Sequence, residues 1–137
     1  NTEIFIYDVS KVNTMKGTNK ISFEKIFTKK FDLIICSHVL EHVSYPRKLL
    51  KNIYKVMNKN TFLYLEMPFE KIMNIKDSNE LLNNKKHWHE HINFFSKASI
   101  EGMLIKSNLK LISLNMLNTK DDQTKRSVFQ VLANKLN

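Results

Sequence analysis

The sequence predicts an α/β fold in which parallel strands are followed by an antiparallel pair of strands. Two apolar segments, residues 31–37 and 61–67, lie on either side of an amphipathic segment that begins at Pro46. A crossover of that size fits a parallel strand–helix–strand unit. Two further apolar segments, 109–117 and 127–133, are joined by a short polar loop. So short a connection requires the two strands to be antiparallel.

The pattern is shorter and less regular at the start of the chain. Residues 3–7 are an apolar run that predicts a buried strand, and residues 13–19 are polar and predict a loop. Residues 21–27 fit either a short strand or a helical turn. We expect 3–7, 31–37 and 61–67 to be parallel neighbours in one sheet. The continuous apolar character of 31–37 is typical of strands covered on both faces.

Two helices are predicted by their end signals and apolar spacing. Pro46 suits the first turn of a helix, because its missing N–H would have no partner there. Apolar residues then recur with the helical period up to Asn58–Asn60, where asparagine takes the place that glycine commonly has. Ser96 is a good N-cap for a helix over residues 97–107. The segment 69–86 is polar and has only a weak helical pattern.

Length and composition exclude several classes of protein. A chain of 137 residues that is 42% hydrophobic can bury one core, so we expect residues 1–137 to form a single domain. Its apolar runs are far shorter than the ~20 residues of a membrane span, and its start lacks the pattern of a secretory signal. The single cysteine, Cys36, cannot form an internal disulfide, which favours a reducing, cytoplasmic compartment.

The formal net charge of +9 raises the question of nucleic-acid binding. Of the 22 basic residues, 20 are lysines spread along the chain, and the two arginines are Arg47 and Arg126. Arginine carries much of the readout of base edges, and no cluster of arginine with aromatic residues is present in the sequence. We therefore expect a solvated, lysine-rich surface and no specific nucleic-acid partner.

Candidate functional residues gather where the predicted strands end. In open parallel sheets, ligands bind beyond the carboxyl ends of the strands. Those ends carry Asp8, Ser37–His38 and Met67–Glu70. A further segment, residues 87–96, contains three of the five histidines. We expect the site to be built from these four stretches.

The same stretches carry a resemblance to a known family. Residues 31–43, read as F-D-L-I-I-C-S-H-V-L-E-H-V, resemble the fourth-strand motif of class I S-adenosylmethionine-dependent methyltransferases, and residues 62–68 resemble the strand that follows it. Residues 90–96, read as E-H-I-N-F-F-S, are similar to members that act on sugars and other small molecules. The resemblance implies a Rossmann-like methyltransferase sheet and S-adenosyl-L-methionine as the cofactor. It also implies a small-molecule acceptor, such as a sugar or surface-polysaccharide precursor.

The chain departs from the family pattern at its start. The glycine-rich turn that approaches the cofactor is absent, since Gly17 and Gly102 are the two glycines of the sequence. Only 22 residues separate Asp8 from Phe31, which leaves little room for a full helix and strand. We expect the chain to be the C-terminal portion of a longer methyltransferase, inactive or weak in cofactor binding by itself. The alternative is a degenerate, non-catalytic domain that binds a partner.

The resemblance assigns cofactor binding to four residues. Asp8 resembles the acid that holds the ribose hydroxyls, although it could simply cap the next turn. Cys36 and Ser37 occupy positions where backbone groups line the family's cofactor pocket, and His38 is expected in the pocket wall. We expect Glu41–His42 to stabilise the loop that leads into the following helix by hydrogen bonds.

Glu90 and His91 are the candidate catalytic pair. Methyl transfer from a sulfonium is an in-line displacement, and an acceptor hydroxyl or acidic C–H must lose a proton. Histidine titrates near neutral pH, so His91 is the predicted base, with Glu90 orienting His91 or the substrate. A structural histidine at the rim of the sheet is the alternative. His87, His89 and His91 alternate and could share a face as metal ligands, but no fourth ligand is evident, and we expect no metal.

Overall fold

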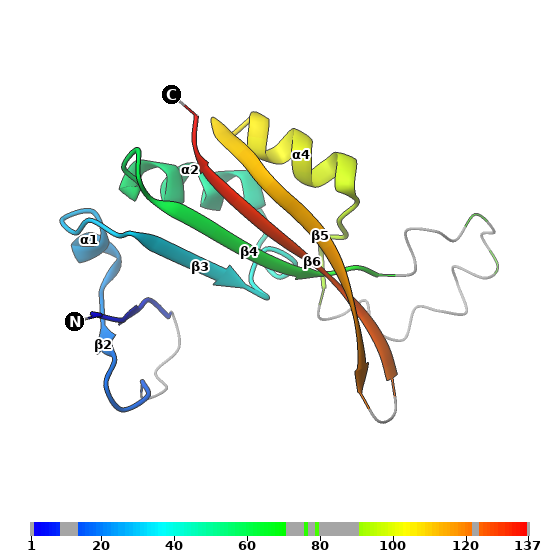
Figure 1. Ribbon diagram of the computed structural model, residues 1–137, viewed down its shortest axis with the longest axis horizontal. Helices are drawn as coiled ribbons and strands as arrows, with labels where there is room; N and C mark the ends of the chain where they lie inside the picture. The colour runs from blue at the N-terminus through cyan, green and yellow to red at the C-terminus, as the bar shows by residue number, and fades with distance from the viewer. Residues whose placement is uncertain are drawn as a thin grey trace. The chain divides into compact units, whose positions relative to one another are not determined.

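The computed structural model describes residues 2–8, 14–70, 76, 79, 91–121 and 124–136 (Figure 1). The chain divides into two compact units, Asn1–Lys30 and Phe31–Asn137. In the first unit, β1 (Phe5–Ile6) and β2 (Asn19–Lys20) are parallel and form a two-stranded sheet. The expectation that residues 3–7 pair in one sheet with the later strands is therefore wrong, because their backbone groups pair with β2.

A short helix completes the first unit. Residues 21–27 were compatible with a strand or a helical turn, and the structure has the helix α1 (Phe23–Ile26) there. Ser22 precedes the helix in an extended conformation, and its side chain accepts a hydrogen bond of 3.4 Å from the backbone N–H of Lys25. This N-cap satisfies one of the N–H groups that a helix leaves without a partner at its start.

The second unit is built on a four-stranded sheet with the order β3-β4-β6-β5 (Figure 1). The strands β3 (Leu33–Ser37) and β4 (Phe62–Pro68) are parallel, as predicted. The strands β5 (Leu109–Asp121) and β6 (Thr124–Lys135) form the predicted antiparallel pair and are longer than expected. β6 lies between β4 and β5 and is antiparallel to both, so the C-terminal strand is inserted into the sheet and β5 forms its edge.

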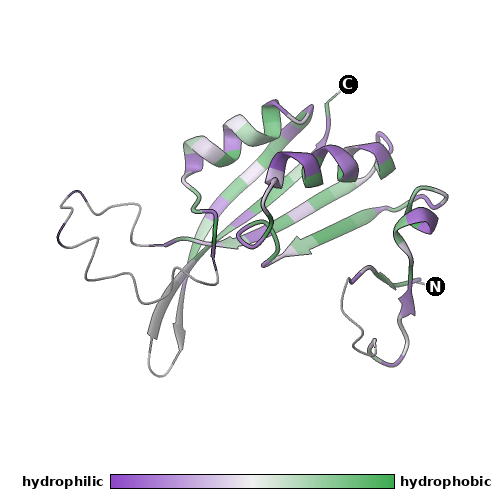
Figure 2. Ribbon diagram, turned by 180° about the vertical axis from the view of Figure 1, so that it is seen from behind, coloured by the Kyte–Doolittle hydropathy of each residue, from purple (hydrophilic) through white to green (hydrophobic). Residues whose placement is uncertain are grey.

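Two helices cover one face of this sheet, as Figure 2 shows. The helix α2 (Pro46–Val56) begins at the predicted proline. The helix α4 (Lys97–Ile105) begins after Ser96, whose side chain accepts from Ser99 N at 3.1 Å while the Ser99 hydroxyl is 2.8 Å from Ser96 N. These reciprocal bonds confirm the predicted N-cap.

The ends of the two helices differ from each other. The C-cap of α2 is Met57 in an extended conformation. The expectation that an asparagine at Asn58–Asn60 ends the helix in the place of glycine is therefore wrong, because neither asparagine has a positive φ. Asn58 instead accepts a 2.7 Å hydrogen bond from the N–H of Asn60 through its side chain, which closes a turn without a left-handed residue. A positive φ of 57° does occur at Asn108, between α4 and β5.

The core lies between the sheet and the two helices. Every second residue of β4 points into it, and these residues, Leu63, Leu65 and Met67, are fully buried against α2 and α4 residues such as Leu50 and Leu104. The opposite face of the sheet is more open. Leu33 and Ile35 of β3 are 51% and 64% exposed, so the expected cover on both faces is not found. The reason is that α2 and α4 lie on the same face of the sheet.

Candidate active site at the carboxyl ends of β3 and β4

The backbone turns sharply where β3 ends. Ser37 is the last residue of the strand, and His38 follows with a φ of 52°, in the left-handed region. The N–H of His38 donates a 2.9 Å hydrogen bond to the carbonyl oxygen of Glu66 in β4. Because β3 and β4 are parallel and Ser37 lies opposite Glu66, the side chains near the carboxyl ends of both strands lie at the same edge of the sheet.

Glu66 is the centre of the first polar group at this edge. Its carboxylate accepts hydrogen bonds from the Tyr64 hydroxyl at 2.7 Å, the Gln130 amide at 3.0 Å and the Ser37 hydroxyl at 3.1 Å. Nε2 of His38 lies 3.5 Å from the same carboxylate. These donors lower the pKa of Glu66, Gln130 having the largest effect, and favour the ionised carboxylate. Burial and the neighbouring Glu66 raise the pKa of Tyr64 to about 12, so its phenol stays a donor.

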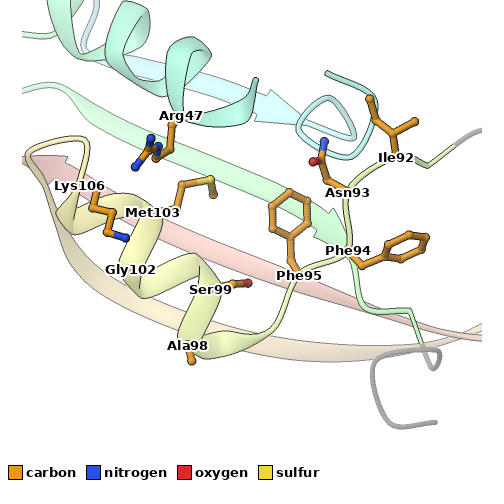
Figure 3. Close-up of a pocket in the computed structure, with 10 residues that line it drawn as sticks. All are labelled: Arg47, Ile92, Asn93, Phe94, Phe95, Ala98, Ser99, Gly102, Met103 and Lys106. Carbon is orange, nitrogen blue, oxygen red and sulfur yellow. The ribbon is translucent and has the colours of Figure 1, made fainter. Parts of the chain in front are cut away.

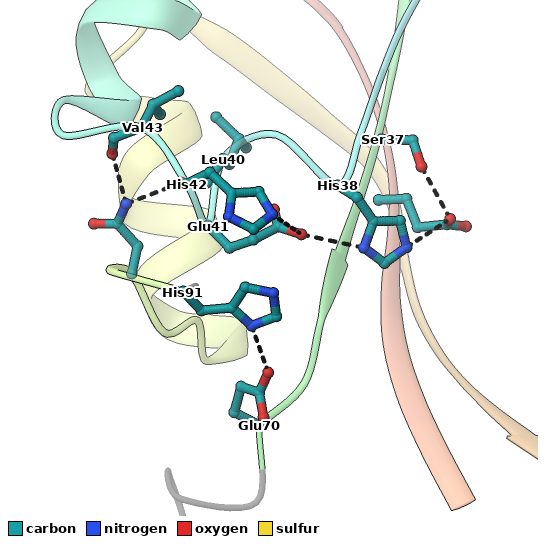
Figure 4. Close-up of polar contacts among 10 residues, drawn as sticks. Ser37, His38, Leu40, Glu41, His42, Val43, Glu70 and His91 are labelled. Carbon is teal, nitrogen blue, oxygen red and sulfur yellow. Dashed lines mark hydrogen bonds and ion pairs between the residues drawn. The ribbon is translucent and has the colours of Figure 1, made fainter. Parts of the chain in front are cut away.

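Glu41 is the centre of the second polar group (Figure 4). It is fully buried, and its Oε1 lies 3.1 Å from Nδ1 of His38 and 3.9 Å from Nε2 of His42. Its other carboxylate oxygen, Oε2, has no hydrogen-bond partner among the described residues. His38 therefore stands between the carboxylates of Glu41 and Glu66.

The 38–43 turn is tied to the segment that precedes α4. The carbonyl oxygen of Glu41 accepts hydrogen bonds from the N–H groups of Ile92, at 2.9 Å, and Asn93, at 3.1 Å. The side-chain amide of Asn93 donates to the carbonyl oxygens of Leu40, at 3.0 Å, and Val43, at 2.7 Å. These four bonds hold the residue before Ile92, which is His91, beside the turn.

His91 lies in contact with two side chains at this edge. Its Nδ1 is 2.7 Å from Oε1 of Glu70, two residues beyond the end of β4. Its ring meets that of His42 edge to face, with the ring centroids 4.9 Å apart. The side chain of His91 is 23% exposed and that of Glu70 is 32% exposed, so the pair is accessible to a substrate while partly shielded from water.

The predicted site residues have different surroundings in the structure. His91 is brought into a cluster of carboxylates and imidazoles, while its predicted partner Glu90, like His87 and His89, lies outside the described residues. Asp8 is exposed and belongs to the first unit, two residues after β1. Neither Glu66 nor Glu70 was singled out by the sequence pattern as an individual site residue, although the stretch Met67–Glu70 was expected to contribute.

The last two residues of β3, Cys36 and Ser37, point to opposite faces of the sheet. The Cys36 side chain is buried in the core beneath the helices, and burial is the main reason that its thiol pKa rises to about 11. Ser37 points to the other face of the sheet, where its hydroxyl donates to Glu66.

The expected role of Glu41–His42 in stabilising the loop is confirmed for Glu41, through both its carbonyl oxygen and its carboxylate. The alternation of Tyr64 with Glu66 was visible in the sequence, whereas the Gln130 contact required the register of β6.

Two further features of this region bear on what it can bind. Glu41, His42 and His91 each offer one potential metal-ligand atom, and these atoms lie within 4.8 Å of one another. A groove between α2 and α4 is lined by residues that include Arg47, Phe95, Met103 and Lys106 (Figure 3). Among the described residues that line the groove there is no carboxylate and no imidazole; these groups lie instead in the strand-end cluster.

The sheet of parallel strands completed by an antiparallel pair, with polar side chains gathered at the carboxyl ends of β3 and β4, defines a Rossmann-like fold of the methyltransferase type. The chain belongs to a family of methyltransferase domains, whose model matches residues 2–114. The search of curated proteins found no match. In the part of the chain that the structure describes, no helix combines the length and apolar character needed to cross a membrane.

Solved structures share this fold at low sequence identity. A SAM-dependent methyltransferase from Anabaena variabilis is 14% identical with a TM-score of 0.66, over 97% of this chain and 68% of that one. An S-adenosylmethionine-dependent methyltransferase from Mesorhizobium loti is 12% identical with a TM-score of 0.63, over 97% and 80%. LepI, solved in complex with SAM, is 11% identical with a TM-score of 0.65. The match covers 97% of this chain but only 36% of LepI.

Proposed function

We propose that this chain is part of an S-adenosyl-L-methionine-dependent methyltransferase that acts on a small-molecule acceptor. The observation that carries the proposal is the pairing of His91 with Glu70 beside His42, at the edge of the sheet where open parallel sheets bind ligands. Membership in the methyltransferase family and likeness to structures described as SAM-dependent support the cofactor. The resemblance of residues 90–96 supports a sugar or surface-polysaccharide precursor as the acceptor class.

Both compact units belong, in this proposal, to one methyltransferase domain over residues 1–137. The support is that the family model runs from residue 2 to residue 114 and so includes most of both units. Asp8 remains the candidate for holding the ribose hydroxyls of the cofactor, because it is an exposed carboxylate that follows a strand and a carboxylate accepts hydrogen bonds from hydroxyl groups.

The residues at the end of β3 are compatible with a cofactor-binding role. The side chains of Ser37 and His38 are exposed and polar, while Cys36 could contribute only through its backbone because its side chain is buried. When bound, S-adenosyl-L-methionine supplies a methyl group on a positively charged sulfur. The protein then has to orient an acceptor and remove its proton.

In the proposed reaction, His91 takes the proton that the acceptor hydroxyl or acidic C–H loses. A new N–H bond forms on the imidazole as the O–H or C–H bond of the acceptor breaks. The electron pair that is left on the acceptor would bond to the methyl carbon while the methyl–sulfur bond breaks, with S-adenosylhomocysteine as the leaving group. Glu90 completes the proposed pair by orienting His91 or the substrate. General-base catalysis of this kind contributes typically 10²–10⁴-fold to the rate, so His91 has a large expected effect.

The test uses the full-length protein with S-adenosyl-L-methionine and a panel of nucleotide-activated sugars, with release of S-adenosylhomocysteine as the readout. His91→Asn keeps a hydrogen-bonding group but cannot accept the proton, so turnover should fall by about 10²–10⁴-fold. Binding of S-adenosylhomocysteine, measured by calorimetry, should stay nearly unchanged in the same variant. Glu90→Gln should cost less. Normal turnover of His91→Asn would contradict the proposed base.

The cofactor assignment is tested separately by binding. Asp8→Ala should weaken S-adenosylhomocysteine binding by about 1–3 kcal/mol, the usual cost of losing hydrogen bonds to a charged group. Glu3→Ala is the matched control, because Glu3 is an exposed carboxylate of the same unit. Equal affinities of the two variants would remove Asp8 from the site. Absence of both binding and turnover in the full-length protein would favour a non-catalytic domain.

A further inference from the structure

We propose that Glu70 is a positioning residue for His91, which holds the hydrogen of the imidazole on Nδ1 and leaves the lone pair on Nε2. The inference rests on the proposed role of His91 as proton acceptor and adds a residue that the sequence pattern did not single out. It also names the nitrogen of His91 that does the chemistry.

The contact between the two side chains defines the tautomer. Nδ1 of His91 lies 2.7 Å from Oε1 of Glu70, which is short for a hydrogen bond between nitrogen and oxygen. An ionised carboxylate can only accept, so the nitrogen must be the donor. In a neutral imidazole only one nitrogen carries a hydrogen, and Nε2 is therefore the nitrogen able to accept a proton.

The second ring nitrogen, Nε2, is directed to the polar edge of the sheet. Figure 4 shows that the second nitrogen of the His91 ring lies on the side away from Glu70, toward Glu41 and His42. The ring of His42 stands edge to face against that of His91, which restricts rotation of the imidazole. The ring therefore presents Nε2 to the cluster and Nδ1 to Glu70.

Both partners are held by neighbouring backbone contacts. The residue before Glu70 is Phe69, whose N–H donates to the carbonyl oxygen of Ser127 at 2.8 Å and whose ring packs edge to face on that of Phe129. On the other side, the N–H of Ile92 is anchored on the carbonyl oxygen of Glu41. A contact supported on both sides costs little reorganisation when the substrate binds, which is the condition for efficient proton transfer.

The carboxylate has a second consequence for the reaction. When Nε2 accepts a proton, the imidazole becomes a cation, and the negative charge of Glu70 lies next to it. The same arrangement of carboxylate, imidazole and substrate proton is used wherever a carboxylate orients a catalytic histidine. Glu41 does not have this role toward Nδ1 of His91, because Nδ1 is bonded to Glu70 and Glu41 lies on the other side of the ring.

The decisive measurement is the tautomer of His91, which needs no acceptor. Long-range ¹⁵N–¹H correlation spectra of the full-length protein, with labelled histidine at neutral pH, distinguish a protonated Nδ1 from a protonated Nε2. We expect the Nδ1–H form of His91 in the native protein. Glu70→Ala should convert His91 to a mixture or to the Nε2–H form, while Glu70→Gln, whose carbonyl still accepts, should retain much of the Nδ1–H form. Glu101→Gln, at an exposed carboxylate of α4, is the matched control.

The kinetic readout separates positioning from simple structural support. With the nucleotide-activated sugars, Glu70→Ala should lower kcat by about 10- to 100-fold, less than loss of the base itself, and leave the affinity for S-adenosylhomocysteine nearly unchanged. Glu70→Gln should recover part of kcat. Circular dichroism spectra identical to that of the native protein would show that the change in kcat of both variants is not caused by unfolding.

Three results would overturn the inference. The first is an Nε2–H tautomer of His91 in the native protein, and the second is a tautomer that does not respond to Glu70→Ala. The third is binding of Co²⁺, used as an optical probe, that is lost in His91→Asn, because His91 would then be a metal ligand with Glu41 and His42. Normal turnover of His91→Asn would instead contradict the proposed function, and the tautomer spectra would still decide the contact with Glu70.

Discussion

Ser37 and Glu66 stand opposite each other in the parallel strands β3 and β4, and the Ser37 hydroxyl donates a 3.1 Å hydrogen bond to the Glu66 carboxylate. The pair joins the last residue of one strand to the centre of a polar group on the next. Tyr64 and Gln130 donate to the same carboxylate from β4 and β6. Three strands of the sheet are thus connected by one ionised side chain.

The first prediction concerns the pH dependence of stability. Because these donors lower the pKa of Glu66 in the folded state, the carboxylate contributes stability above its unfolded pKa of ~4.3. This contribution should be lost as the pH falls through the lower, folded pKa. Glu66→Gln should reduce the free energy of unfolding at pH 7 by about 1–3 kcal/mol. The free energy of unfolding of this variant should also decrease less steeply as the pH is lowered.

Urea unfolding at a series of pH values from neutral to acidic measures this effect. Glu101→Gln is the control, because Glu101 is an exposed carboxylate on α4. If Glu66→Gln and the native protein lose stability in parallel on acidification, Glu66 does not contribute to the pH dependence of the free energy of unfolding.

A second prediction follows from the left-handed backbone at His38, where φ is 52°. A residue with a Cβ atom is strained there, whereas glycine is not. His38→Gly and His38→Ala both lose the contacts with Glu41 and Glu66, but the glycine variant should be more stable by about 1 kcal/mol. At Lys51, an exposed position inside α2, the order should be reversed, with alanine favoured by about 1 kcal/mol. Chemical denaturation of the four variants checks both orders, and the same order at both positions would contradict the strain.

Asn93 provides a third prediction. Its side-chain amide donates to the carbonyl oxygens of Leu40 and Val43, which ties the 38–43 turn to the segment before α4. Asn93→Asp is similar in shape but cannot donate, and it places a carboxylate oxygen against two carbonyl oxygens. It should therefore destabilise the protein by about 2–3 kcal/mol, at least as much as Asn93→Ala. Thermal unfolding measures this, with Asn115→Asp on the exposed side of β5 as the control. Equal stability of the two aspartate variants would argue against the tie.

The fourth prediction concerns the reactivity of Cys36. Burial raises the pKa of its thiol to about 11, so little thiolate is present at pH 8. Alkylation by iodoacetamide should be slower in the native protein than in urea by about 100-fold or more, since an unfolded cysteine has a pKa of ~8.5. Mass spectrometry of the modified chain follows the reaction. Comparable rates in native and unfolded protein would place the thiol outside the core.

Much of the second unit could be predicted from the sequence because the signals are local. The continuous apolar runs at 31–37 and 61–67 indicated strands without reference to the rest of the chain. Pro46 and Ser96 marked the first turns of two helices, since a missing N–H and a capping hydroxyl act within one helical turn. The short connection after residue 117 required an antiparallel pair for reasons of chain length alone.

The pairings between distant segments were decided only by the tertiary structure. No local pattern shows that β6 inserts between β4 and β5, or that residues 5–6 pair with residues 19–20. These choices depend on which backbone groups and which apolar faces meet, and every competing arrangement satisfies the same local preferences. The sequence could identify the strands of the second unit, but it predicted a loop over residues 13–19, where β2 begins. It could not determine which strands are neighbours.

The candidate site shows the same division. The sequence by itself determined that His91 belongs to a histidine-rich segment and that polar residues follow the central strands. Only the tertiary structure decided that Glu70, 21 positions away along the chain, lies 2.7 Å from Nδ1 of His91. Hydrogen bonds between side chains act over about 3 Å, so their partners are selected by the packing of strand ends and loops rather than by proximity in the sequence.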